Sequence, residues 1–151
     1  MTKPRHSHYR YLAGFTLVEL MIVIMIATIL LTVAIPGYKT SIRKSRRTDA
    51  KTALLDIASR EERYFNTANP PGYSATPTDL GYTSFTPVGS GYYNVTVAVT
   101  PAAPPSTPAQ FTITAVPVPG SDQAKDAQCT QFQLDNLGRQ TSLPNVTGCW
   151  Q

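Results

Sequence analysis

The stretch Phe15–Ile35 reads FTLVELMIVIMIATILLTVAI and carries one charge, Glu19. As an α-helix these residues would extend about 31 Å at ~1.5 Å per residue, and the hydrocarbon core of a bilayer is about 30 Å thick. A domain of this size cannot enclose a helix that is apolar on every side. We therefore expect this segment to span a membrane.

The segment before this helix, residues 1–14, is short, polar and basic (MTKPRHSHYRYLAG). A secretory signal peptide has its small-residue cleavage site after the apolar stretch. Here Gly14 comes first, so cleavage after Gly14 would remove the charges and keep the helix. It would also remove three of the thirteen Lys and Arg residues and both histidines. The remainder would be nearly neutral and would contain no histidine, the commonest general base and metal ligand.

The apolar run is interrupted by Pro36-Gly37. Pro36 has no backbone N–H, so the carbonyl of Thr32 loses its helical partner, and we expect a helix break or weak point at Pro36 and Gly37. The helical pattern then resumes and stops at Asn69-Pro70-Pro71-Gly72. We predict one helix from about Phe15 to about Thr67, apolar in its first half and amphipathic in its second.

The second half of this helix has an apolar face with spacings of three, four and seven residues. That face consists of Ala50, Ala53, Leu54, Ile57, Ala58, Tyr64 and Phe65. The basic side chains are assigned to other faces: Lys39, Arg43, Lys44, Arg46, Arg47, Lys51 and Arg60.

After the helix, residues 68–151 are rich in Pro, Gly, Thr and Tyr and contain short alternating runs typical of strands. The predicted strands are Tyr92–Thr100, Gln110–Val118, Thr130–Asp135 and Arg139–Ser142. Asn136-Leu137-Gly138 predicts a tight hairpin between the last two. Three or four antiparallel strands alone make a marginal sheet, so we expect them to pack on the amphipathic part of the helix. The predicted fold class is α+β.

Two cysteines, Cys129 and Cys149, lie near the C-terminus. In a small domain outside the cytosol such a pair indicates a disulfide. The alternative is a pair of unpaired, buried thiols.

The junction Gly14-Phe15-Thr16-Leu17-Val18-Glu19-Leu20 resembles the class III signal of type IV prepilins. This resemblance implies that an aspartic prepilin peptidase cuts after Gly14 and methylates the new N-terminus, Phe15. It also divides the chain into a leader (1–14), a transmembrane and assembly helix (15–37), an amphipathic continuation (38–67) and a C-terminal β domain with a disulfide loop (68–151). In the family, the segment at Pro36-Gly37 can lose helical order inside the filament.

Glu19 is costly in this position, since a carboxylate within a bilayer is unfavourable by roughly 2.5–3.5 kcal/mol. The helix dipole at the first turn offsets only about 0.3–1 kcal/mol. Cleavage after Gly14 creates an amine on Phe15, and Glu19 of an incoming subunit can pair with that amine on a neighbour. We expect this pair to set the register of assembly. The alternative is a carboxylate that reaches the membrane surface and has no role in assembly.

The C-terminal part is similar to PilE-like minor pilins at Cys129–Asp135 with Gly138 and at Gly148-Cys149-Trp150. The implied function is that of a structural subunit of a type IV pilus used for twitching motility, adhesion or DNA uptake. The implied partners are other pilin subunits, prepilin peptidase and the inner-membrane assembly machinery. The expected location is the inner membrane with the C-terminal domain in the periplasm, and then the extracellular pilus.

The segment Lys39–Lys51 contains six Lys or Arg residues and one acid, Asp49. This basic cluster suits contact with lipid headgroups, nucleic acid or acidic patches of neighbouring subunits, or it is a solvated helix face. We predict no catalytic residues, metal site or cofactor, and hence no enzyme. Two alternatives remain: a pseudopilin of type II secretion, and an adhesin or DNA-binding module displayed on the pilus.

Overall fold

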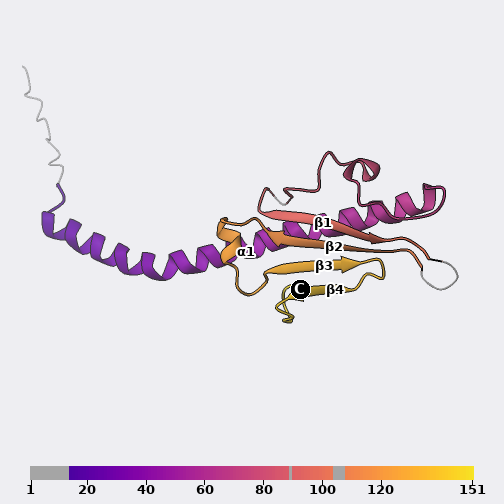
Figure 1. Cartoon of the computed structure of the whole chain (residues 1–151). Coiled ribbons are helices and arrows are strands. Elements are labelled where there is room, and N and C mark those ends of the chain that lie inside the picture. The colour runs from indigo at the N-terminus through magenta and orange to yellow at the C-terminus, as the bar shows by residue number, and fades with distance from the viewer. Residues whose placement is uncertain (1–13, 89, 104–107) are drawn as a thin grey trace, which may run out of the picture. The chain divides into compact units, whose positions relative to one another are not determined.

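The computed structural model describes residues 14–88, 90–103 and 108–151 and has the helices and strands labelled in Figure 1. The helices are α1 (Leu17–Thr67) and the 3-10 turns η1 (Pro77–Leu80) and η2 (Asp122–Lys125). The strands are β1 (Tyr93–Thr100), β2 (Gln110–Pro117), β3 (Gln131–Asp135) and β4 (Gln140–Leu143). The chain divides into two compact units, Met1–Lys39 and Thr40–Gln151, which we describe in turn.

The described part of the first unit is the apolar beginning of α1. Its side chains are exposed, and the helix is long and apolar enough to cross a membrane, with a mean hydropathy of 2.7 over its most apolar window. The helix begins at Leu17 because the Thr16 hydroxyl accepts a hydrogen bond from the backbone N–H of Glu19 (3.2 Å), as an N-cap residue does. The helical assignment continues through Pro36 and Gly37.

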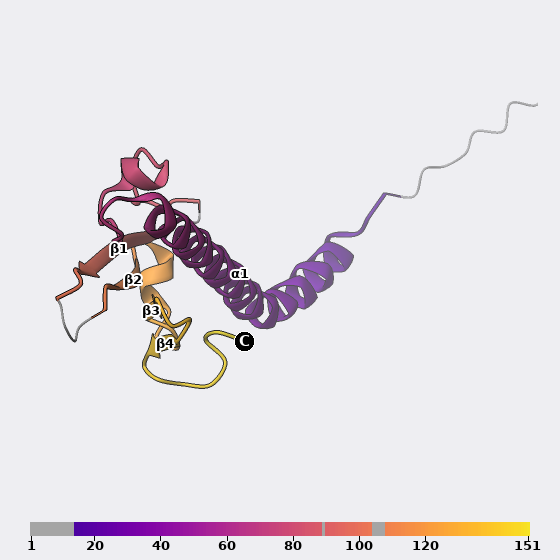
Figure 2. The same cartoon turned by 90° about the vertical axis from the view of Figure 1, so that its right-hand side faces the viewer.

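The second unit holds a four-stranded antiparallel sheet in the order β1-β2-β3-β4, which Figure 2 shows from one end with the second half of α1 beside it. The pairings place Val95 opposite Ala115 and Ile113 opposite Leu134, so that buried residues of neighbouring strands share one face. This face carries the core, which explains why every second residue of β2 and β3 is buried.

The core forms where the sheet meets α1. Ala50, Leu54 and Ile57 of the helix are at most 1% exposed. The sheet contributes Tyr93, Val95, Phe111, Ile113, Ala115, Phe132 and Leu134, and Leu80, Phe85, Cys129 and Cys149 complete the cluster. The α+β fold class is therefore confirmed, and so are the four strands, whose ends differ from the predicted ends by at most one residue.

The buried stripe of α1 differs from the prediction in its charged residues. It runs Arg47, Ala50, Leu54, Ile57 and Glu61, so the assignment of Arg47 to a face other than this one was wrong. Arg47 tolerates burial because a carboxylate of the loop after η2 pairs with it, as described below. Other residues predicted for this face are only partly buried: Ala53, Ala58, Tyr64 and Phe65.

The disulfide between Cys129 and Cys149 is present, as predicted. Both residues are 1% exposed and belong to the core cluster. The bond fastens the C-terminal loop to the start of β3, and Trp150 beside it packs edge-on against Phe132 with 5.7 Å between ring centroids. The last residues of the chain are thereby part of the packed domain.

Glu61 is fully buried, and one of its carboxylate oxygens, Oε1, has no hydrogen-bond partner. The other oxygen accepts the backbone N–H of Ser74 (3.0 Å), which ties the chain after α1 to the helix. Burial raises the pKa of the Glu61 carboxyl, and the nearby charges of Glu62 and Asp79 act in the same direction, while the Ser74 hydrogen bond opposes them. The folded domain therefore favours the protonated form of this side chain more than the unfolded chain does.

We expect the Glu61→Gln variant to lose one component of the pH dependence of stability. A carboxyl with a raised pKa stabilises the fold below its unfolded pKa, and that contribution disappears as pH rises through the folded pKa. Glutamine keeps the acceptor for Ser74 and does not ionise. The melting temperatures of wild type and variant, measured from pH 4 to pH 8, should therefore diverge in favour of the variant as pH increases. Parallel curves would contradict the burial of an ionisable Glu61.

Removal of the disulfide by the double substitution Cys129→Ser and Cys149→Ser should cost about 3 kcal/mol of unfolding free energy, the chain-entropy value for a loop of this length. Urea unfolding followed by Trp150 fluorescence measures this loss. The native wild-type protein should not react with a thiol reagent before reduction. Reaction of two equivalents would show that the bond is absent in the protein.

Candidate functional site

The junction predicted to be processed lies at the start of α1. Gly14, Phe15 and Thr16 are not helical, and all three are exposed. Glu19 follows in the first turn, also exposed. Gly14 and Phe15 precede the first helical hydrogen bond, which runs from the Leu20 N–H to the Thr16 carbonyl (3.2 Å). Residues 1–13 of the leader lie outside the described residues. The predicted roles of Gly14, Phe15 and Glu19 stay predictions.

The predicted break at Pro36 and Gly37 is not a helix end in this structure, since α1 continues to Thr67. Gly37 has open space where a side chain would begin. Its predicted melting in a filament stays a prediction.

The basic cluster Lys39–Lys51 is largely engaged in contacts within the second unit. Arg47 forms a two-pronged ion pair with Asp126: Nε donates to Oδ2 (2.6 Å) and Nη2 donates to Oδ1 (2.5 Å). The two side chains are 8% and 3% exposed. A charge that is buried and paired in this geometry is held in place, because loss of either partner leaves the other unpaired in the interior.

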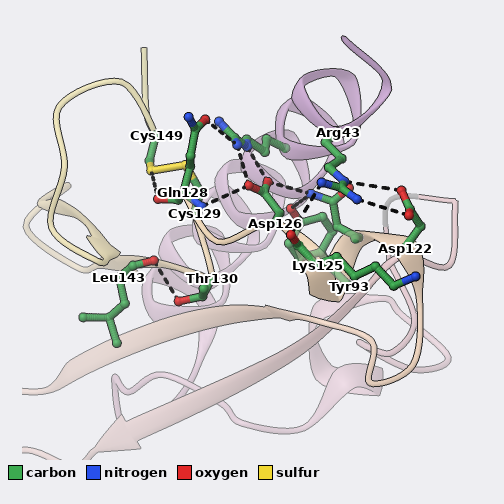
Figure 3. Close-up of polar contacts among 12 residues, drawn as sticks. Arg43, Tyr93, Asp122, Lys125, Asp126, Gln128, Cys129, Thr130, Leu143 and Cys149 are labelled. Atoms are coloured by element: carbon green, nitrogen blue, oxygen red, sulfur yellow. Dashed lines mark hydrogen bonds and ion pairs between the residues drawn. A yellow bond between two sulfur atoms is a disulfide. The ribbon is translucent and has the colours of Figure 1, made fainter. Parts of the chain in front are cut away.

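Two amide side chains contact the Arg47–Asp126 pair. Figure 3 labels Asp126, Gln128 and Tyr93 of this network. Arg47 also donates to Oε1 of Gln128 (3.2 Å), and the buried Gln123 donates from Nε2 to Asp126 (3.1 Å) and to the hydroxyl of Tyr93 (2.9 Å). Burial is the main cause that raises the pKa of Tyr93 to about 12. This network connects α1, β1 and the segment 122–128.

Two further arginines bind the same segment. The Arg43 guanidinium donates to both oxygens of Asp122 (3.3 and 3.2 Å), and Arg46 lies 3.8 Å from that carboxylate. Arg46 also stacks over the ring of Tyr92, 3.6 Å from its centroid. The three arginines of the cluster therefore serve intramolecular contacts.

The lysines of the cluster are used differently. Lys44 is exposed, and Lys51 donates from Nζ to the backbone carbonyl of Gln151 (3.2 Å). Burial, and secondarily the positive charge of Arg47, lower the pKa of Lys51. Of these two lysines, Lys44 is therefore the one whose charge faces solvent.

A groove lies between α1 and the C-terminal loop that the disulfide holds. It consists of two adjoining cavities of about 530 Å³ and about 180 Å³, which share Lys44, Arg47, Gly148 and Cys149. The remaining lining residues are Thr48, Lys51, Ala127, Gln128, Cys129, Pro144, Val146, Thr147 and Gln151. None of these lining residues is an aspartate or glutamate; Arg47 is paired with Asp126, and Lys51 donates to the main-chain oxygen of Gln151 within the groove.

Among the described residues, no group of three or more His, Cys, Asp or Glu side chains is placed to hold a metal ion. Sequence reasoning missed the partners of the arginines, Asp122 and Asp126. One signal was available for Arg47: it precedes Ala50 by three residues and so continues the buried stripe.

Comparison with known proteins adds two family matches. A family described as "Type IV minor pilin ComP, DNA uptake sequence receptor" matches residues 36–133. A family described as "Prokaryotic N-terminal methylation motif" matches residues 10–35, which include the predicted processing junction.

A curated relative is the type IV major pilin protein PilA of Myxococcus xanthus (strain DK1622), which is 35% identical over 69 residues. The alignment covers 46% of this chain and 30% of that protein, so the chain matches less than a third of that relative's length. The match to residues 36–133, in contrast, covers well over half of the chain. The chain therefore belongs to the type IV pilins, in the family described as type IV minor pilin ComP, DNA uptake sequence receptor.

Proposed function

We propose that this chain is a minor subunit of a type IV pilus that takes up DNA. The observation that carries the proposal is the family match over residues 36–133, whose description names both a minor pilin and a DNA uptake sequence receptor. The apolar start of α1 and the packed α+β domain provide the two parts that a filament subunit needs. Twitching motility and adhesion are further uses that the same filament would support.

The proposed route begins in the inner membrane, with α1 as a single span and the β domain in the periplasm. The disulfide supports this placement, since such bonds persist in oxidising compartments. Prepilin peptidase would cut between Gly14 and Phe15 and methylate the new amine. The match to the N-terminal methylation motif and the non-helical backbone at this junction support that step.

Assembly would then join the subunit to other pilins through the membrane helix. The exposed apolar side chains from Leu17 to Ile35 need a lipid or protein environment, and a bundle of such helices supplies one. We infer that Glu19 of one subunit pairs with the methylated amine of Phe15 on its neighbour, which offsets the cost of a carboxylate in that bundle. The inner-membrane assembly machinery would supply the force.

A major subunit is the second candidate, because the Myxococcus xanthus relative carries that description. The two candidates differ in the amount of protein in the filament. A minor subunit should be a trace component of sheared filaments, whereas a major subunit should be the dominant band.

Gly14→Val should block processing. Glycine leaves the backbone open to the peptidase, whereas a β-branched side chain obstructs its approach. We expect full-length precursor to accumulate in the inner membrane and the mature N-terminus, Phe15, to be lost from mass spectra of filament fractions. If wild-type filament subunits still carry residues 1–14, the proposed cleavage does not occur.

Glu19→Val should separate insertion from assembly. The helix becomes more apolar, so insertion and cleavage should persist. The amine of a neighbouring Phe15 loses its partner, at about 3–5 kcal/mol, so incorporation into filaments should fall by at least about a hundredfold. Uptake of labelled DNA by a strain with only this variant should fall in parallel.

The control for Glu19→Val is Thr28→Val, because the Thr28 hydroxyl donates to the carbonyl of Ile24 in its own helix (2.7 Å) and has no charge to pair. Immunoblots of membrane and sheared-filament fractions provide the measurement. Wild-type recovery of the Glu19→Val protein in filaments would show that Glu19 has no role in assembly. Normal DNA uptake by a strain whose filaments lack the variant would show that this chain does not act in uptake as part of the pilus.

A further inference from the structure

The stretch of sequence from Leu80 to Ser121 contains no charged residue. It includes β1, β2 and the connections on either side of them. Charged side chains on an edge strand are one means by which proteins prevent that strand from pairing with another chain. β1 lies at one edge of the four-stranded sheet, and none of its eight residues supplies such a charge.

The pairing with β2 shows which main-chain groups of β1 point away from the sheet. The Val118 N–H donates to the Tyr92 carbonyl (2.9 Å), and bonded pairs alternate with non-bonded pairs along an antiparallel ladder. Even-numbered residues of this strand therefore direct their N–H and C=O groups toward β2. The odd-numbered residues, which direct these groups outward, are Tyr93, Val95, Val97 and Val99.

The first half of this outer edge is covered by the chain itself. Val88 exchanges two main-chain hydrogen bonds with Tyr93 (2.9 and 3.3 Å). The Thr86 hydroxyl accepts the N–H of Val95 (3.1 Å) and donates to its carbonyl (3.0 Å). Within the described residues, no hydrogen bond reaches the outward groups of Val97 and Val99. The second half of the edge is therefore open.

We propose that the second half of β1 binds an extended, uncharged segment of another protein, which adds a strand beside Val97 and Val99. The alternating donors and acceptors of this edge match those of an extended main chain. Both valine side chains are half-buried against the core, so an apolar side chain of the added strand would extend that core. The uncharged surroundings favour an uncharged segment, because a charge buried there would lose water without gaining a partner.

The edge fits a segment of a different protein better than a second copy of this chain. β4, the other edge of the sheet, is four residues long, and Ser142 within it is 6% exposed, so its main chain is largely inaccessible. Antiparallel pairing of β1 with β1 of another copy would reverse one α1 relative to the other, because the second half of α1 runs along the strands (Figure 1). Subunits anchored in one membrane share a direction, and this last step rests on the proposed function.

The test uses the full-length protein in detergent micelles and a synthetic peptide of alternating valine and threonine, with a lysine outside each end for solubility. Amide hydrogen exchange is followed by NMR. Without the peptide, the amides of Tyr93 and Val95 should exchange slowly and those of Val97 and Val99 quickly. Saturating peptide should slow exchange at Val97 and Val99 by at least about tenfold. The same peptide with every interior amide N-methylated has no donors there and should have no effect.

Val99→Pro removes one outward N–H and no bond to β2, a change that edge strands tolerate. The affinity for the peptide, measured by chemical-shift titration, should fall about fivefold or more. The control is Val99→Thr, which keeps the N–H and the shape of the side chain and should bind like the wild type. Melting curves verify that both variants fold. Wild-type affinity in a folded Val99→Pro variant would show that the main-chain edge is not the site.

Two other results would also overturn the inference. Equal binding of the N-methylated peptide by the wild-type chain would mean that side chains alone hold it, and this comparison does not depend on the folding of any variant. Protection of Val97 and Val99 without peptide, increasing with protein concentration alongside dimers in sedimentation, would assign the edge to a second copy. Filament incorporation of the wild type is measured separately, so that its failure would contradict the proposed function and leave the exchange result unaffected.

Discussion

The buried ion pair between Arg47 and Asp126 joins α1 to the segment after η2, and the surroundings of the groove depend on it. Removing two charges from water is costly, and this geometry recovers the cost with two short hydrogen bonds and neighbouring amides. Without Asp126, Arg47 could not occupy the buried stripe next to Ala50. The pair therefore extends the buried face, which Ala50, Leu54 and Ile57 define, toward the start of the domain.

The same pair determines where the C-terminal loop lies. Asp126 precedes Cys129 by three residues, and Gln128 contacts Arg47, so one end of the disulfide is held against the helix. The other end, Cys149, brings Gly148 and Gln151 to the side of Lys44 and Lys51. The Gln128–Arg47 contact holds the segment before β3 against the helix, and the Cys129–Cys149 bond then holds the C-terminal loop to that segment. Together they place the loop beside α1.

The sequence was sufficient for the features that depend on local pattern. The apolar run, the amphipathic period of α1 and the alternation in each strand predicted the elements and the α+β class, because such periodicities reflect which face is buried. The cysteine pair was also predictable. The pairing of Arg47 with Asp126 was not, since 79 residues separate them and a buried charge contradicts the usual pattern. Glu61 was missed for the same reason.

Arginine and lysine behave differently within the basic cluster. A guanidinium is planar and suits two-pronged contact with a carboxylate or stacking on a ring, whereas an ammonium is a compact and strongly hydrated charge. Arg43, Arg46 and Arg47 follow the first behaviour, with Asp122, Tyr92 and Asp126 as partners. Lys44 is exposed, whereas Lys51 donates to the main-chain oxygen of Gln151. The basic segment therefore contains cations held by internal partners as well as a solvent-facing one, and the sequence alone does not distinguish them.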